Sequence, residues 1–164
     1  MVRILLVCSL FLFAGCLAQE PAGRTGHAER TRPLVVTKEN GVLKVETAGR
    51  SCVVADDALD YEVHPSPDGS ALAVETLVMS NLQTLRLYTK GADGCFHPCE
   101  RDAAVELWGE LAKKEGFSVE EVERPRMKFL KWTGPRTLLL NLSGETPSGG
   151  IDANVTFTLP PRRK

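Results

Sequence analysis

Residues 64–75, HPSPDGSALAVE, decide the fold of this chain. Their first half combines proline, aspartate and glycine, the residue types that close tight turns. Their second half opens an apolar run at Ala71. We therefore predict a strand that ends near Val63, a turn over residues 65–69 and a second strand from Ala71, which together form an antiparallel hairpin.

The rest of the chain repeats this pattern of short strands and turns. Asn40 and Gly41 separate two β-forming segments, and an Asn-Gly pair in that position is a strong hairpin signal because both residues tolerate positive φ. Alternation or β-forming composition predicts further strands at residues 52–54, 82–89, 127–132, 136–142 and 154–159. Turn-forming residues fill the links between the last three of these strands.

The strand predicted at residues 127–132 has two different faces. Alternation places Leu130 and Trp132 on one face, and Met127 and Phe129 on the other. We expect the face that carries Leu130 and Trp132 to be the buried one.

One segment departs from the period of two and predicts an amphipathic helix near residues 102–115. Its apolar residues recur at helical spacing and are Val105, Trp108, Leu111 and Ala112. Asp102 is a suitable N-cap and Gly116 a suitable stop. We expect this stripe to pack on a sheet.

These elements predict a mainly β (α+β) fold, a small antiparallel sheet or sandwich with one amphipathic helix. The SPDG turn and the apolar strand after it resemble the repeats of TolB-like and WD40-like β-propellers, over residues 58–89. The resemblance implies blade-like hairpins. A propeller needs at least about four blades of roughly 40 residues, so we expect these hairpins to form one small sheet or sandwich instead.

The N-terminus predicts export. Arg3 precedes an almost unbroken apolar run at residues 4–13, which ends in small residues as a signal peptide does. The run is about ten residues long, whereas a membrane-spanning helix needs roughly twenty. We therefore expect a targeting segment and not a permanent anchor.

Two cleavage schemes remain open at the end of this segment. The sequence LFAGC at residues 12–16 resembles the lipobox of bacterial lipoproteins, which implies that Cys16 becomes a lipidated N-terminus. Leu17 follows the cysteine, and by resemblance to sorted lipoproteins this implies the periplasmic face of the outer membrane. The alternative is ordinary cleavage after Ala18, which would give a soluble secreted or periplasmic protein.

The chain then divides into a signal peptide at residues 1–15, a flexible tether at residues 16–32 and a single β-rich domain at residues 33–164. The tether holds glycine, proline and charged residues without an apolar period, so it can bury little. The remaining length of about 130 residues suits one domain. The formal net charge of -1 provides no basic field, so we expect no nucleic-acid partner.

The stretch GCFHPC, residues 94–99, brings Cys95, His97 and Cys99 close together in the sequence. Exported thiols meet oxidising conditions, so we predict a disulfide between Cys95 and Cys99. This pairing would leave Cys52 as a buried free thiol. Two alternatives remain, a bond from Cys52 to one of these cysteines, and a metal or redox centre on Cys95, His97 and Cys99, although zinc would need a fourth ligand.

The sequence carries no G-x-S-x-G, H-E-x-x-H or S-x-x-K signature and no phosphate-binding glycine loop. A group of carboxylates, Asp56, Asp57, Asp60 and Glu62, is interpreted as a solvated turn because its spacing is not that of a calcium loop. We therefore expect a lipid-anchored, non-catalytic envelope protein without a cofactor, which binds another envelope protein or a cell-wall component. The alternatives are a soluble secreted binding module and a metal or thiol protein centred on Cys95, His97 and Cys99.

Overall fold

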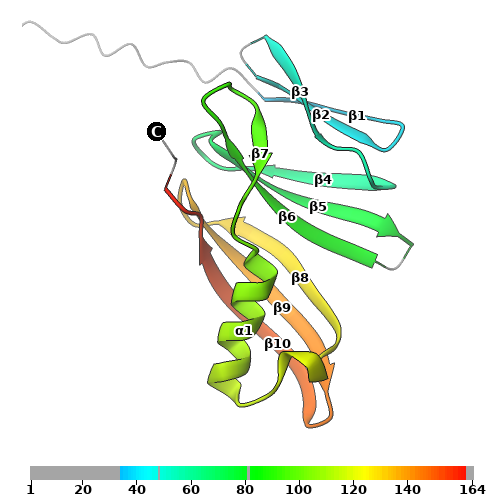
Figure 1. Ribbon diagram of the computed structural model, residues 1–164, viewed down its shortest axis with the longest axis vertical. Coiled ribbons are helices and arrows are strands. Elements are labelled where there is room, and N and C mark those ends of the chain that lie inside the picture. The colour runs from blue at the N-terminus through cyan, green and yellow to red at the C-terminus, as the bar shows by residue number, and fades with distance from the viewer. Residues whose placement is uncertain (1–33, 48, 81, 162–164) are drawn as a thin grey trace, which may run out of the picture. The chain divides into compact units, whose positions relative to one another are not determined.

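The computed structural model describes residues 34–47, 49–80 and 82–161, all of which belong to one compact unit, Thr31–Lys164. These described residues form ten β-strands, one α-helix and one short 3-10 helix (Figure 1). The fold is mainly β with a single α-helix, as the sequence predicts. The signal peptide and tether predicted at residues 1–32 lie outside the described residues.

The strands form three antiparallel sheets. The first sheet contains β1 (Val35–Glu39), β2 (Val42–Thr47) and β3 (Arg50–Ala55). The central sheet contains β4 (Asp60–Pro65), β5 (Ala71–Met79), β6 (Leu82–Lys90) and β7 (Phe96–Pro98). The third sheet has the order β10-β9-β8 and contains β8 (Glu123–Trp132), β9 (Thr137–Thr146) and β10 (Gly149–Thr158). Within each sheet, the strands that follow one another in the chain are paired, so each sheet is a simple meander.

The turns that the sequence predicts close two hairpins, β1–β2 and β4–β5. Asn40 and Gly41 join β1 to β2 with φ of 51° and 76°, the left-handed conformation that the Asn-Gly pair tolerates. In the turn between β4 and β5, the Ser66 hydroxyl accepts hydrogen bonds from the backbone N–H groups of Ser70 and Ala71, at 3.1 and 2.9 Å. Both predicted hairpins are confirmed.

The helix α1 (Ala103–Glu115) begins and ends where its signals predict. The Asp102 carboxylate accepts from the backbone N–H groups of Ala104 and Val105 in the first turn. Gly116 ends the helix in the left-handed conformation, with φ of 79°. The 3-10 helix η1 (Val119–Glu121) then leads into β8. No helix within the described part of the chain is both long and apolar enough to cross a membrane.

The buried stripe of α1 differs at one position from the predicted stripe. Leu107, Trp108 and Leu111 form its centre, whereas Val105 is 70% exposed. The prediction that Val105 packs on a sheet is therefore wrong. It follows the helical spacing, but it lies at the margin of the stripe, where the helix has already turned toward solvent.

Two hydrophobic cores lie on opposite faces of the central sheet. Side chains alternate along a strand, so β5 directs Ala71 and Ala73 to one core, and Leu72 and Val74 to the other. The helix core collects residues of the central sheet, α1 and the third sheet, among them Leu87, Trp108, Leu138, Leu140 and Phe157. The N-terminal core collects residues of the first and central sheets, among them Leu43, Val45, Tyr61, Tyr88 and Phe96. The central sheet is therefore covered on both faces.

The strand β8 corrects the predicted orientation of its side chains. Leu130 is 41% exposed, whereas Met127, Phe129 and Trp132 pack against the helix core. The pairing of β8 with β9 shifts register between Phe129 and Lys131. This bulge adds one residue to the strand, so Trp132 joins the face of Phe129 and Leu130 turns outward. The prediction for Trp132 is confirmed, and the prediction for Leu130 is wrong.

Candidate functional site

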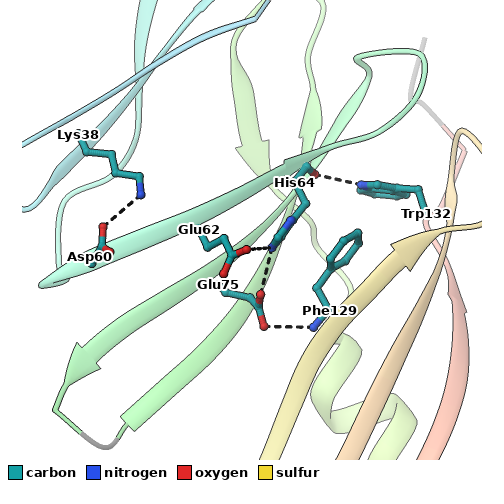
Figure 2. Close-up of polar contacts among 7 residues, drawn as sticks. All are labelled: Lys38, Asp60, Glu62, His64, Glu75, Phe129 and Trp132. Carbon is teal, nitrogen blue, oxygen red and sulfur yellow. Dashed lines mark hydrogen bonds and ion pairs between the residues drawn. The ribbon is translucent and has the colours of Figure 1, made fainter.

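Two adjacent strands of the central sheet place an imidazole and two carboxylates together. Glu62 and His64 lie two residues apart on β4, so they share a face of the sheet. Glu75 lies on β5, directly opposite Glu62 in the strand register. Figure 2 shows the three side chains converging, with one nitrogen of the His64 ring directed at both carboxylates. We call Glu62, His64 and Glu75 the His-Glu cluster.

The distances within the His-Glu cluster are those of direct polar contacts. The His64 Nε2 atom lies 3.0 Å from Oε2 of Glu75 and 3.7 Å from Oε1 of Glu62. The Glu75 side chain is only 3% exposed, the His64 side chain 20% and the Glu62 side chain 69%. The cluster therefore runs from a buried carboxylate to a solvent-accessible one, with the imidazole between them.

The strand β8 holds two members of the cluster in place. The backbone N–H of Phe129 donates to Oε1 of Glu75 at 3.2 Å, which leaves Oε2 directed at His64. The Phe129 ring stacks on the His64 ring with 4.2 Å between centroids and 17° between planes. The indole N–H of Trp132 donates to the His64 carbonyl at 3.0 Å. These contacts, drawn in part in Figure 2, restrict both the carboxylate and the imidazole.

The charge balance of the cluster is unusual for a buried site. A buried carboxylate is costly unless it is paired and hydrogen-bonded. Among the described residues, the ion pairs of Glu62 and Glu75 are with His64 alone. Even when His64 is protonated, the imidazolium and the two carboxylates together carry a net charge of −1. The cluster therefore has the charge to accept a cation.

Two of the other predicted carboxylates, Asp57 and Asp60, have separate partners. The Asp57 carboxylate pairs with Arg86 at 3.0 Å, and Asp60 pairs with Lys38 at 3.1 Å. The backbone N–H of Tyr61 and the Lys38 ammonium hold the pKa of Asp60 below its ordinary value. Of the group predicted at Asp56, Asp57, Asp60 and Glu62, two residues thus form these ion pairs, Glu62 belongs to the His-Glu cluster, and Asp56 is exposed.

The cysteines correct the predicted pairing. Cys52 of β3 is bonded to Cys95, which precedes β7, with 5.7 Å between their Cα atoms. Cys99 is free and half-buried. The predicted Cys95–Cys99 disulfide is therefore wrong, and the alternative bond from Cys52 is the one formed.

The reason is the extended strand between the two predicted partners. Phe96–Pro98 form β7, which pairs with β6. Four steps of extended chain separate Cα atoms by about 13 Å, whereas a disulfide requires roughly 4.4–6.8 Å. A tight loop would have allowed the Cys95–Cys99 bond, and pairing with β6 prevents that loop.

The alternative prediction, a metal or thiol centre on Cys95, His97 and Cys99, does not fit the disulfide. The sulfur of Cys95 is oxidised in the disulfide, so it is not available as a thiolate ligand. His97 instead contacts Asp93 at 3.0 Å, and both side chains are about half exposed. This hydrogen bond and the N–H of Cys95 lower the pKa of the Asp93 carboxyl. The predicted lipidation residue, Cys16, lies outside the described residues.

Sequence reasoning missed the His-Glu cluster, although one signal was present. Glu75 is a charged residue within the apolar run ALAVETLV at residues 71–78. Charged residues are almost never fully buried without a partner, so a strand of this composition predicts a buried contact for its glutamate. The partner itself depends on strand register, which the local sequence does not reveal.

No protein-family model matches the chain, and no significant match was found among curated proteins or among solved structures.

Proposed function

We propose that this protein is a lipid-anchored, non-catalytic protein of the bacterial cell envelope, with its β domain acting as a binding or structural module. The proposal rests on the sequence LFAGC at residues 12–16, which overlaps the end of the apolar run and ends in Cys16. A flexible tether at residues 16–32 would allow the domain to stand away from the membrane and meet an envelope protein or a cell-wall component.

The disulfide between Cys52 and Cys95 supports export of the domain. Disulfides persist in oxidising compartments such as the periplasm and are rare in the cytosol. The bond joins residues 43 positions apart and links the first sheet to the central sheet. Folding in an oxidising compartment is therefore consistent with the apolar segment at the N-terminus.

The anchor is tested by replacing Cys16 with serine in the full-length precursor. Serine cannot form the thioether to a diacylglyceryl group, so we expect Cys16→Ser to lose labelled fatty acid and to leave the outer-membrane fraction or accumulate unprocessed. Cys8→Ser is the matched control because Cys8 lies within the same apolar segment. Cys8→Ser should be labelled and fractionated as the wild type is. Unchanged labelling and fractionation of Cys16→Ser would refute the anchor.

The alternative is a soluble secreted binding module released by cleavage after Ala18. Mass spectrometry of the mature N-terminus distinguishes the two products. A diacylated peptide that begins at Cys16 supports the anchor, and an unmodified peptide that begins at Gln19 supports the soluble form.

A further inference from the structure

We propose that Glu62, His64 and Glu75 bind a divalent transition-metal ion of the Zn²⁺ class. This inference is independent of the lipid anchor. It rests on the His-Glu cluster, whose three ligand atoms, one from each side chain, all lie within 4.8 Å of one another.

The ligand set suits such an ion. Zn²⁺ accepts imidazole nitrogen and carboxylate oxygen at about 2.0–2.2 Å, and imidazole favours transition metals over Mg²⁺ and Ca²⁺. Ligands at this distance around a tetrahedral ion lie about 3.4 Å apart. The separations of 3.0 and 3.7 Å from His64 Nε2 to the two carboxylates are on either side of that value. Small side-chain movements would therefore suffice to receive the ion.

The surroundings already orient the ligands. Metal-binding side chains are commonly fixed by a second set of hydrogen bonds. Here the N–H of Phe129 occupies Oε1 of Glu75, so Oε2 is the oxygen that faces His64. The stacked Phe129 ring fixes the imidazole plane. Since these contacts come from another sheet, the site depends on the folded domain and does not exist in an isolated hairpin.

The charge and the exposure of the cluster also favour a cation. A divalent ion would neutralise both carboxylates, which His64 alone does not do. Glu75 is buried and Glu62 is mostly exposed, so the ion would enter from the Glu62 side. Three protein ligands would leave at least one position for water, as in open zinc sites.

The test is calorimetric titration of the untagged full-length protein with Zn²⁺, together with thermal unfolding in the presence and absence of Zn²⁺. We expect one-to-one binding and a Zn²⁺-dependent rise in Tm, because a ligand that binds only the folded state stabilises it. Glu62→Gln removes an exposed ligand and leaves the buried pair intact. We expect it to weaken Zn²⁺ binding by about tenfold or more. Glu75→Gln keeps the acceptor for Phe129 but removes the buried charge, and we expect it to abolish the one-to-one site.

Two matched controls distinguish this site from adventitious surface binding. Glu46→Gln makes the same charge change at an exposed position of β2. His97→Asn removes the exposed imidazole beside Asp93. Both variants should bind Zn²⁺ as the wild type does. The proposal is overturned if the wild type shows no saturable binding, if Glu62→Gln retains the wild-type affinity, or if His97→Asn is the variant that loses it.

Discussion

Tyr88 of β6 is 2% exposed and lies in the N-terminal core beside Leu72, Val74 and Phe96. An ionised phenolate would lose its hydration in this apolar environment. Burial accordingly raises the pKa of Tyr88 above its ordinary value, and a hydrogen bond with Arg86 offsets part of the rise. The folded protein therefore keeps this phenol neutral at a pH where the unfolded chain ionises it.

The raised pKa of Tyr88 makes the free energy of unfolding fall at high pH. The unfolded phenol ionises near pH 10, so the contribution of neutral Tyr88 is fully present below about pH 10 and is lost as the pH rises through the folded-state pKa. We expect the free energy of unfolding to fall more steeply between about pH 9 and 11 in the wild type than in Tyr88→Phe. Urea unfolding at several pH values measures both curves. Parallel curves for the two proteins would contradict the prediction.

Glu75 explains why the candidate site is only partly predictable from the sequence. Its position in an apolar run indicates that the carboxylate is buried with a partner. His64 is 11 positions away and Phe129 is 54 positions away. The first contact lies within a hairpin that the turn residues predict, although they do not predict its register, and the second depends on how β8 packs on the central sheet. No local pattern contains that information.

At the level of elements, turn and capping residues predict the ends of strands and of the helix correctly. Asn40 and Gly41 close a hairpin, and Asp102 and Gly116 delimit α1, because each acts on its own neighbours in the chain. The faces of β8 are predicted incorrectly because the bulge beside Phe129 arises in the pairing with β9. A strict period of two cannot anticipate an extra residue in one strand.

Because of this bulge, we predict that truncating Leu130 and truncating Trp132 will have different effects on stability. Leu130 is 41% exposed, so Leu130→Ala should change the free energy of unfolding by no more than about 0.5 kcal/mol. Trp132 packs partly against the helix core and donates to His64 O, so Trp132→Ala should cost about 2 kcal/mol, less than the roughly 3–5 kcal/mol of a fully buried aromatic. Chemical unfolding of both variants tests the difference. An equal or larger loss in Leu130→Ala would show that β8 presents its other face to the core.

At the level of the whole domain, the central sheet joins two cores, and each core needs residues distant in sequence. The first sheet contributes Leu43 and Val45 to the N-terminal core, whereas the third sheet contributes Leu138 and Leu140 to the helix core. The sequence predicts the single α-helix and every described strand except β7, and these predictions are confirmed. The sequence does not predict the division into three sheets and leaves a bond from Cys52 only as an alternative, because both depend on which strands meet in space.

The disulfide therefore has a consequence for the domain beyond its own loop. It closes 43 positions of chain and ties β3 of the first sheet to the start of β7 in the central sheet. A crosslink of this span restricts the unfolded chain by about 4 kcal/mol in the loop-entropy treatment, and a bond between Cys95 and Cys99 would contribute much less. Pairing with Cys52 thus predicts a large effect on stability.

We expect the double variant Cys52→Ser, Cys95→Ser to lose about 3–4 kcal/mol of unfolding free energy. Cys99→Ser is the matched control, and it should change stability by less than about 1 kcal/mol because Cys99 is free and only half-buried. Denaturant midpoints of the oxidised proteins measure both effects. Hydrogen exchange should show the greatest loss of protection in β1, β2 and β3, because the first sheet loses its covalent tie to the central sheet. A control variant as unstable as the double variant, or a linked Cys95–Cys99 peptide from the unreduced wild type, would show that the tie lies elsewhere.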